Sequence, residues 1–256
     1  MNSFPPKHSP SDDRGKVVYG IHPVEELLQS RKNVERIFIQ RDLKKETAAS
    51  IFRMAKESDI PVLSVPKEKL NRMAGTNHQG VAAIISQIQF FKFDDVLSQV
   101  YEKGEVPLFI ICDRITDVRN FGAIARTGLC GGSHAIIVPH SETASINAEA
   151  IKASAGALNK IAVCREKNLV NTMKQLKLNG IQTLAADAKG SKFIFDCDLK
   201  IPTAIIMGSE GAGIDSALLR LVDEIVKLPM TGDFDSYNVS VAAGMILYEV
   251  MRQRMK

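Results

Sequence analysis

The sequence lacks the features that would point to a membrane protein, a secreted protein or a metalloprotein. None of its apolar runs approaches bilayer-spanning length, and its first residues hold no apolar segment typical of a secretion signal. Its five histidines show no spacing suited to a metal ion. Its four cysteines, Cys112, Cys130, Cys164 and Cys197, lie far apart without a C-x-x-C pair, which favours reduced and buried thiols. We therefore expect a cytoplasmic protein without a bound metal.

The composition predicts a globular chain with two domains. Of its 256 residues, 45% are hydrophobic and 24% are charged, and this length is enough for two separate cores. Residues 1–16 differ, because they hold Pro5, Pro6, Pro10 and three serines without apolar periodicity. That composition predicts a disordered tail.

Residues 17–93 alternate helical and strand patterns, which predicts a small α/β domain. The segment contains 12 Lys and Arg against 8 Asp and Glu. A surplus of this size fits either an RNA-binding surface or an ordinary solvated helix face. The expected helices cover Pro23–Ser30 and Leu43–Glu57, and the expected strands cover Val34–Ile39, Pro61–Val65 and Gly80–Ile85.

Residues 94–106 are expected to link this domain to the next one. A short helix is predicted from Asp94 to Tyr101, and Lys103-Gly104-Glu105 is a polar turn suited to a hinge. On this interpretation, a chain that begins near Glu105 should fold by itself.

Residues 107–256 continue the alternation of strands and helices. Apolar runs such as Pro107–Cys112 and Ala204–Met207 are typical of strands buried in a parallel sheet. The segment predicts a doubly wound α/β domain with its ligand at the carboxyl edge of the sheet. Further strands are expected over His134–Val138, Ile161–Cys164, Ile181–Ala186 and Glu224–Leu228, and helices from Asn120, over Asn147–Ala155 and Leu169–Leu178, and from Ser236.

A glycine-rich turn after Met207 is a candidate cofactor site. Its order, G-x-x-G-x-G, matches neither the dinucleotide fingerprint nor the lysine-bearing phosphate loop. Glu210 is the only side chain in it that can act as an acid or a strong acceptor. A nucleotide hydrolase is disfavoured, because Ile214 and Asp215 stand where Lys and Ser or Thr would be needed.

Three separated blocks in the C-terminal half carry a resemblance to a known family. They are Asn120–Thr127, Met207–Gly213, and Leu228–Met230 together with Ser236–Ser240. In this order and at these distances they resemble the motifs of the SpoU/TrmH family of RNA ribose 2′-O-methyltransferases. Three ordered blocks are far more specific than any one of them.

The resemblance implies more about the fold than the alternation of elements does. It implies a SPOUT-type catalytic domain over 107–256, with a deep C-terminal trefoil knot and dimerisation beside that knot. It also implies an L30e-like RNA substrate-binding domain over 17–93, since Tyr19–Val24 and His78–Val81 resemble the two ends of that domain. Without the family, His22 reads as a helix-capping residue. His78 could contact RNA or form a structural turn.

The resemblance also implies the cofactor and the site. S-adenosylmethionine would donate the methyl group, and a bulky Gly208→Val substitution should then block its approach. The expected catalytic residues are Asn120, Arg126, Glu210 and Asn238, and the expected cofactor-binding residues are Met207, Gly208, Leu228, Met230 and Tyr237.

The role of Arg126 has two interpretations. It lies among small and apolar residues, where a buried guanidinium would need a partner, so it could form a structural salt bridge, for example to Glu210. Alternatively it assists deprotonation of the 2′-hydroxyl; because arginine is almost always protonated, orienting phosphate or stabilising an alkoxide is the simpler role. The chain departs from the family at Asp117, which is followed by Val118 rather than proline. That departure puts the rigidity of the loop in doubt.

The expected substrate is a guanosine of large-subunit (23S) ribosomal RNA, and transfer RNA is the alternative. Asn120 is expected to cap its helix and leave its amide for the substrate. A catalytically silent RNA-binding scaffold is a further alternative, which the presence of all four expected catalytic residues disfavours.

Overall fold

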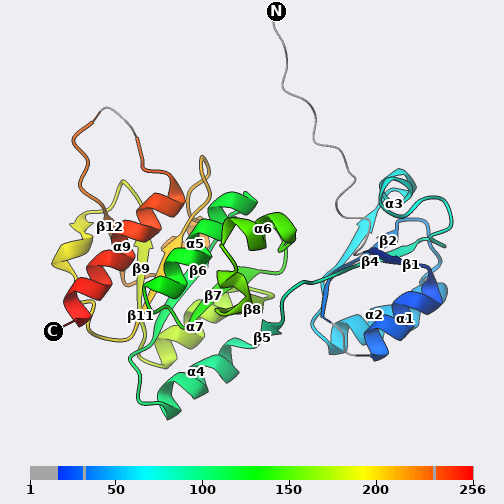
Figure 1. The fold of residues 1–256 in the computed structure, drawn as a ribbon, viewed down its shortest axis with the longest axis horizontal. Coiled ribbons are helices and arrows are strands. Elements are labelled where there is room, and N and C mark those ends of the chain that lie inside the picture. The colour runs from blue at the N-terminus through cyan, green and yellow to red at the C-terminus, as the bar shows by residue number, and fades with distance from the viewer. Residues whose placement is uncertain (1–16, 31–32, 233–234, 256) are drawn as a thin grey trace, which may run out of the picture. The chain divides into compact units, whose positions relative to one another are not determined.

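The chain forms two compact units, Met1–Gln87 and Ile88–Lys256 (Figure 1). The computed structural model describes residues 17–30, 33–232 and 235–255. The tail expected over 1–16 lies outside the described residues. Over the described ranges, the search for a long apolar helix that could cross a bilayer finds none.

In the first unit, helices cover both faces of a mixed sheet. The strand order is β1-β4-β2-β3, in which β4 is antiparallel to β1 and β2, and β3 is parallel to β2. Side chains alternate along β2, so Ile37 and Ile39 pack with α1 and α2, whereas Phe38 packs with Leu70 of α3. The elements are β1 (Val17–Tyr19), α1 (Ile21–Gln29), β2 (Val34–Gln40), the 3-10 helix η1 (Lys45–Ala48), α2 (Ala49–Glu57), β3 (Val62–Val65), α3 (Lys67–Ala74) and β4 (Val81–Ile85).

His78 has a structural role in the turn before β4. Its ring is 2% exposed; Nδ1 accepts a hydrogen bond from the backbone N–H of Gly80 at 2.8 Å, and Nε2 lies 2.9 Å from Oδ1 of Asn71. Burial lowers the pKa of His78, which favours the neutral ring that these contacts need. Because both ring nitrogens are occupied, the structural interpretation holds and the RNA-contact interpretation does not. His22 does not cap α1 and instead lies 3.4 Å from Glu25.

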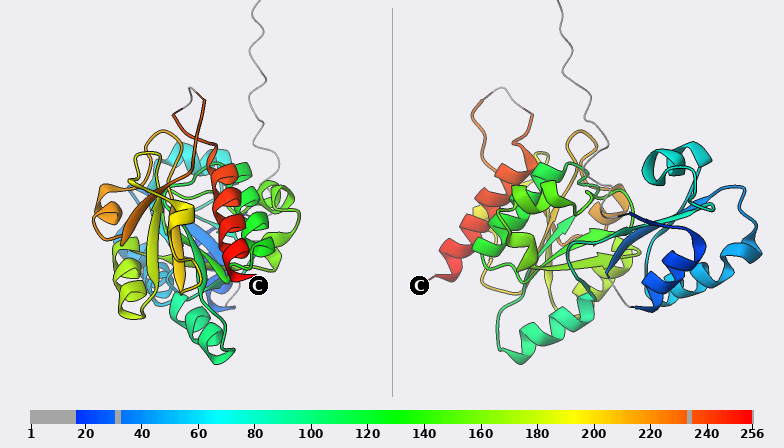
Figure 2. Two further views of the ribbon diagram at one scale, coloured as in Figure 1. Left: turned by 90° about the vertical axis from the view of Figure 1, so that its left-hand side faces the viewer. Right: turned by 45° about the vertical axis from the view of Figure 1, so that its right-hand side comes forward.

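The second unit is a parallel sheet with helices on both faces (Figures 1 and 2). Among the described residues it has eight strands, in the order β10-β12-β9-β11-β6-β7-β8-β5. Helices α5, α6 and α9 pack on one face, and α4, α7 and α8 pack on the other. The elements are β5 (Phe90–Phe91), α4 (Phe93–Glu102), β6 (Leu108–Cys112), α5 (Val118–Cys130), β7 (Ala135–Pro139), α6 (Ala148–Ala153), η2 (Ala157–Asn159), β8 (Ala162–Glu166), α7 (Leu169–Leu178), β9 (Gln182–Ala186), β10 (Lys192–Phe193), η3 (Ile194–Asp196), β11 (Thr203–Met207), α8 (Ser216–Leu219), β12 (Glu224–Lys227) and α9 (Val239–Arg254).

The linker expected over 94–106 is wrong, because α4 is part of the second core. Its apolar side chains are buried against the sheet, and the ring of Phe93 contacts that of Phe109 edge-on with centroids 5.2 Å apart. The preceding strand, β5, pairs with β8. The boundary between the units therefore falls after Gln87.

The cysteines only partly match the expectation. Cys112 and Cys164 are buried in β6 and β8, and burial raises the pKa of each thiol to about 12. Cys197 is also buried, but Cys130 is exposed at the end of α5.

The packing of α4 predicts where the chain can be cut. A fragment 88–256 keeps α4 and should unfold cooperatively, whereas a fragment 105–256 loses four buried side chains, Phe93, Val96, Leu97 and Val100. Each contributes about 1.5–3 kcal/mol, so their loss is comparable to the whole stability of an ordinary domain. Thermal melts of the two fragments followed by circular dichroism test this. Equal melting temperatures would show that α4 is dispensable.

Candidate active site

The expected site residues lie on loops at one edge of the parallel sheet. Strand β11 pairs with β6 on one side and with β9 on the other, and β12 pairs with β9. The loops that follow β6, β11 and β12 therefore leave the sheet at the same carboxyl edge, which is where open α/β sheets bind ligands.

Three of the four expected catalytic residues meet in one hydrogen-bond network. The carboxylate oxygen Oε1 of Glu210 accepts from Nδ2 of Asn120 at 3.0 Å and from Nδ2 of Asn238 at 2.7 Å. Nδ2 of Asn238 also lies 3.0 Å from Oδ1 of Asn120. Because a carboxylate can only accept, the two amides serve as its donors. One residue from each of the three sequence blocks thus contributes to a single cluster.

Helix starts hold both asparagines in place. Asn238 is the N-cap of α9, because its Oδ1 accepts from the backbone N–H of Ser240 at 3.0 Å. Asn120 was expected to be the N-cap of α5, but it is not. Asp117 is, and its Oδ1 accepts from the backbone N–H groups of Arg119 and Asn120 at 2.9 and 2.8 Å. The start of α5 is thus capped although Val118, rather than the proline of the resembled family, follows Asp117.

Arg126 is not part of the network. Its side chain is exposed, and among the described residues it forms no hydrogen bond or ion pair. The expected burial and the salt bridge to Glu210 are therefore wrong. Arg126 follows Asn120 by six residues on α5, and this spacing puts the two side chains on different faces of the helix.

The glycine-rich turn after Met207, Gly208–Gly213, is here called the glycine-rich loop, and it folds back on itself. The N–H of Ser209 donates to the carbonyl of Gly213 at 3.2 Å, and the N–H of Gly213 donates to the carbonyl of Ser209 at 2.9 Å. A Cβ at Gly208 would lie 2.4 Å from the backbone of Gly213, so this glycine is required by the loop itself. Gly208→Val would therefore distort the loop whether or not a cofactor binds there. Met207 is buried in β11.

The loop after β12 is open to solvent. Met230 and Tyr237 are 36% and 38% exposed, and the hydroxyl of Tyr237 donates to the carbonyl of Pro229 at 3.0 Å. None of the backbone–backbone hydrogen bonds outside the regular elements involves the described residues of 228–237. Part of the expected loop, residues 233–234, lies outside the described residues.

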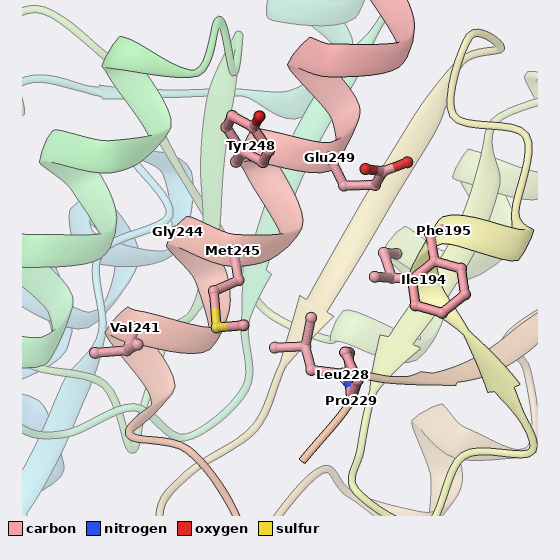
Figure 3. Close-up of a pocket in the computed structure, with 9 residues that line it drawn as sticks. All are labelled: Ile194, Phe195, Leu228, Pro229, Val241, Gly244, Met245, Tyr248 and Glu249. Atoms are coloured by element: carbon pink, nitrogen blue, oxygen red, sulfur yellow. The ribbon is translucent and has the colours of Figure 1, made fainter. Parts of the chain in front are cut away.

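A cavity of about 450 Å³ lies between this loop and α9 (Figure 3). Of the five residues expected to bind the cofactor, only Leu228 lines it, and Met245 of α9 points toward Leu228 across it. The lining residues are mainly apolar: Ile194, Phe195, Leu228, Pro229, Val241, Gly244, Met245, Tyr248 and Glu249.

Two further polar residues at this edge were not among the expected site residues. Asp113 follows β6 and Arg114 follows Asp113. Arg114 donates to the carbonyl of Gly213, at the end of the glycine-rich loop, and Asp113 accepts from the N–H of Asp215, just after that loop. The signal was partly visible, because a charged pair directly after an apolar strand lies at the ligand edge of an α/β sheet. The partners of this charged pair, Gly213 and Asp215, are about a hundred residues away along the chain, so the contacts could not be predicted from the sequence.

Two known family models match this chain, one in each unit. The model of the SpoU rRNA Methylase family matches residues 107–248, and the model of the RNA 2′-O ribose methyltransferase substrate-binding domain matches residues 17–91.

Individual relatives span nearly the whole chain. YacO of Bacillus subtilis, described as a TrmH family tRNA/rRNA methyltransferase, is 35% identical over 237 residues, covering 93% of this chain and 95% of YacO. The SpoU methyltransferase AviRb of Streptomyces viridochromogenes, crystallised with its cofactor AdoMet, is similar with a TM-score of 0.60 and 25% identity over 93% of this chain and 90% of AviRb. The TrmH/SpoU tRNA modifying enzyme of A. aeolicus is similar with a TM-score of 0.54 and 30% identity over 63% of this chain and 83% of its own. The chain therefore belongs to the SpoU/TrmH family of RNA methyltransferases.

Proposed function

We propose that this protein transfers a methyl group from S-adenosylmethionine to a ribose 2′-hydroxyl of RNA. The observation that carries the proposal is the network of Asn120, Glu210 and Asn238, which joins three distant sequence blocks at the carboxyl edge of the sheet. A scaffold without activity would have no need to hold a carboxylate in this way at the surface.

The loops at this edge suit a nucleoside cofactor. The described residues 228–232 and 235–237 offer backbone donors and acceptors that no other described backbone segment uses, so Leu228 and Met230 can hold an adenine and ribose through their main chain. Tyr237 lies beside them with its hydroxyl fixed on Pro229. Met207 and Gly208 lead into the loop that carries Glu210. We assign the cofactor to these five residues.

The cofactor supplies a methyl group already activated on a sulfonium, so the protein mainly positions the acceptor hydroxyl. Both asparagine amides bind Oε1 of Glu210. Oε2 makes no hydrogen bond with the described residues, so it can accept one from the ribose hydroxyl and orient it. The exposed guanidinium of Arg126 is free to hold a phosphate or to stabilise the developing alkoxide.

We propose a guanosine of large-subunit (23S) ribosomal RNA as the substrate, and transfer RNA as the second candidate. The family model that matches the second unit is that of rRNA methylases, and the tRNA enzyme of A. aeolicus aligns with only 63% of the chain. Mapping ribose methylation across total RNA from a deletion strain would identify the site. A position lost from transfer RNA alone would overturn the ribosomal assignment.

We propose that the first unit is an L30e-like domain that binds the RNA substrate. Its match to a substrate-binding model supports this, as do the exposed basic side chains Arg41, Lys44, Lys67, Lys69 and Arg72. Arg36 contributes less to such a surface, because it is paired with Glu35 at 2.9 Å.

We also infer a knotted homodimer. After β12 the chain must return to α5, because Asn238 contacts Asn120 and α9 packs on α5, and such a return past the loop of β11 fits a trefoil knot. Exposed apolar side chains on α9, Val241 and Tyr248, border the cavity of Figure 3 and fit a covered face. A monomeric mass in analytical ultracentrifugation would contradict the dimer.

The substitution Arg126→Lys tests the catalytic assignment. Lysine keeps the charge but loses the planar fork, so methyl transfer in a single turnover should fall by about 100-fold or more. The affinity for S-adenosylmethionine and the melting temperature should hold, because the exposed side chain of Arg126 forms no hydrogen bond or ion pair with the described residues. The matched control is Arg252→Lys, an exposed arginine on α9 paired with Glu249, which should retain its rate. A wild-type rate in Arg126→Lys would leave this arginine without a catalytic role.

Removal of the first unit tests whether RNA binding and cofactor binding lie in different units. The fragment 88–256 should bind S-adenosylmethionine in calorimetry with unchanged affinity, and ATP should not compete. Its affinity for ribosomal RNA should drop by about tenfold or more relative to the full chain. RNA binding by the full chain should weaken as salt rises, since phosphate contacts release counterions. Equal RNA affinity of the fragment and the full chain in filter binding would argue against the first unit as the RNA-binding domain.

A further inference from the structure

The glycine-rich loop is anchored at its base to the end of β6. The carboxylate of Asp113 is 6% exposed, and its Oδ2 accepts from the backbone N–H of Asp215 at 2.7 Å. The same oxygen lies 3.2 Å from Nη2 of Arg114. Asp113 also continues the sheet, because its N–H donates to the carbonyl of Met207 at 2.8 Å. One residue thus touches both the entry and the exit of the loop.

Arg114 adopts a backbone conformation that few residues with side chains adopt. Its φ is +54°, in the left-handed region. In this conformation Nη2 donates to the carbonyl of Gly213 at 3.3 Å while it pairs with Asp113. The carbonyl of Gly213 is also the acceptor for Ser209, so Arg114 binds the point at which the loop closes. An unfavourable backbone conformation that secures a specific contact suggests a function for that contact.

The tip of the loop has little packing of its own. Gly211 has φ +91° and no atom within 4 Å of where a Cβ would be, and Glu210 beside it is exposed. The position of Glu210 is therefore determined by its two asparagine partners and by the base of the loop. Asp113 and Arg114 are the side chains that fix that base to the sheet.

We propose that Asp113 and Arg114 are positioning residues for methyl transfer: they hold the glycine-rich loop so that Glu210 stays in register with Asn120 and Asn238. They act through Glu210 and do not touch the RNA. The inference rests on the proposed function, because it assumes that Glu210 serves the reaction.

The substitution Arg114→Asn tests this. Asparagine tolerates the left-handed backbone, so only the guanidinium is removed. Single-turnover methyl transfer should fall by about 10- to 100-fold, the range expected when a reacting group is misplaced by an ångström. RNA affinity should stay within about twofold, since this arginine is not assigned to the RNA surface. The matched control is Arg220→Asn at the C-terminal end of the nearby α8, an exposed arginine 3.5 Å from Ser216, which should keep the wild-type rate.

A double-mutant cycle with Glu210→Gln separates positioning from general destabilisation. If Arg114 acts through Glu210, Arg114→Asn should reduce the rate of Glu210→Gln by no more than about twofold. Additive losses would overturn the proposal. A wild-type rate in Glu210→Gln alone would also overturn the proposal, because Glu210 would then not serve the reaction. Absence of methyl transfer by the wild-type protein would instead overturn the proposed function, so the two failures are distinguishable.

Amide hydrogen exchange provides a readout independent of activity. The N–H of Asp215 is bound to Asp113, and it should exchange faster in Arg114→Asn and in Asp113→Asn than in the wild type. If Arg114→Asn does not fold, Arg114→Lys keeps the charge and should show the same acceleration to a smaller extent. Unchanged exchange over 208–216 in the folded variants would overturn the proposal.

Discussion

The site depends on one carboxylate held by two neutral amides from different parts of the chain. Glu210 accepts from Asn120 and Asn238, which lie 90 and 28 residues away in sequence. Each asparagine is fixed by the start of a helix, and these helices pack side by side on the same face of the sheet. The hydrogen bonds are exposed, so they contribute little to stability by themselves. Their geometry is supplied by the cores beneath them.

Most of the second unit could be predicted because its strands are continuous apolar runs between polar turns. The parallel sheet and helices such as α7 follow from that pattern. The helix α4 was expected, but its place in the second core was not. An amphipathic helix has the same sequence pattern whether its apolar face covers a sheet or lies in a linker between two domains. In the first unit, α3 was missed because it buries only Leu70 and so shows little apolar periodicity.

Three residues of the candidate site could be named from the sequence, but their contacts could not. Asn120, Glu210 and Asn238 could be named from short blocks, yet only the fold shows that they meet. Arg126 was expected to be buried among its small neighbours, yet it is exposed although Ala125, one residue before it, is buried, because consecutive helix residues point in different directions. Gly208 was read as room for a ligand, whereas the backbone of Gly213 occupies that room. A glycine that permits internal contact looks the same in sequence as one that permits binding.

Holding Glu210 with asparagines has a consequence for charge at the site. A salt bridge to Arg126 would have neutralised the carboxylate and used the guanidinium at once, and neither group could then have served a substrate. Amide donors orient the carboxylate while adding no charge. On the proposed function, the carboxylate is thereby left for the ribose hydroxyl. The cation remains exposed on α5, where a phosphate can reach it. On the proposed function, the carboxylate and the guanidinium are both left for the substrate because they do not pair with each other.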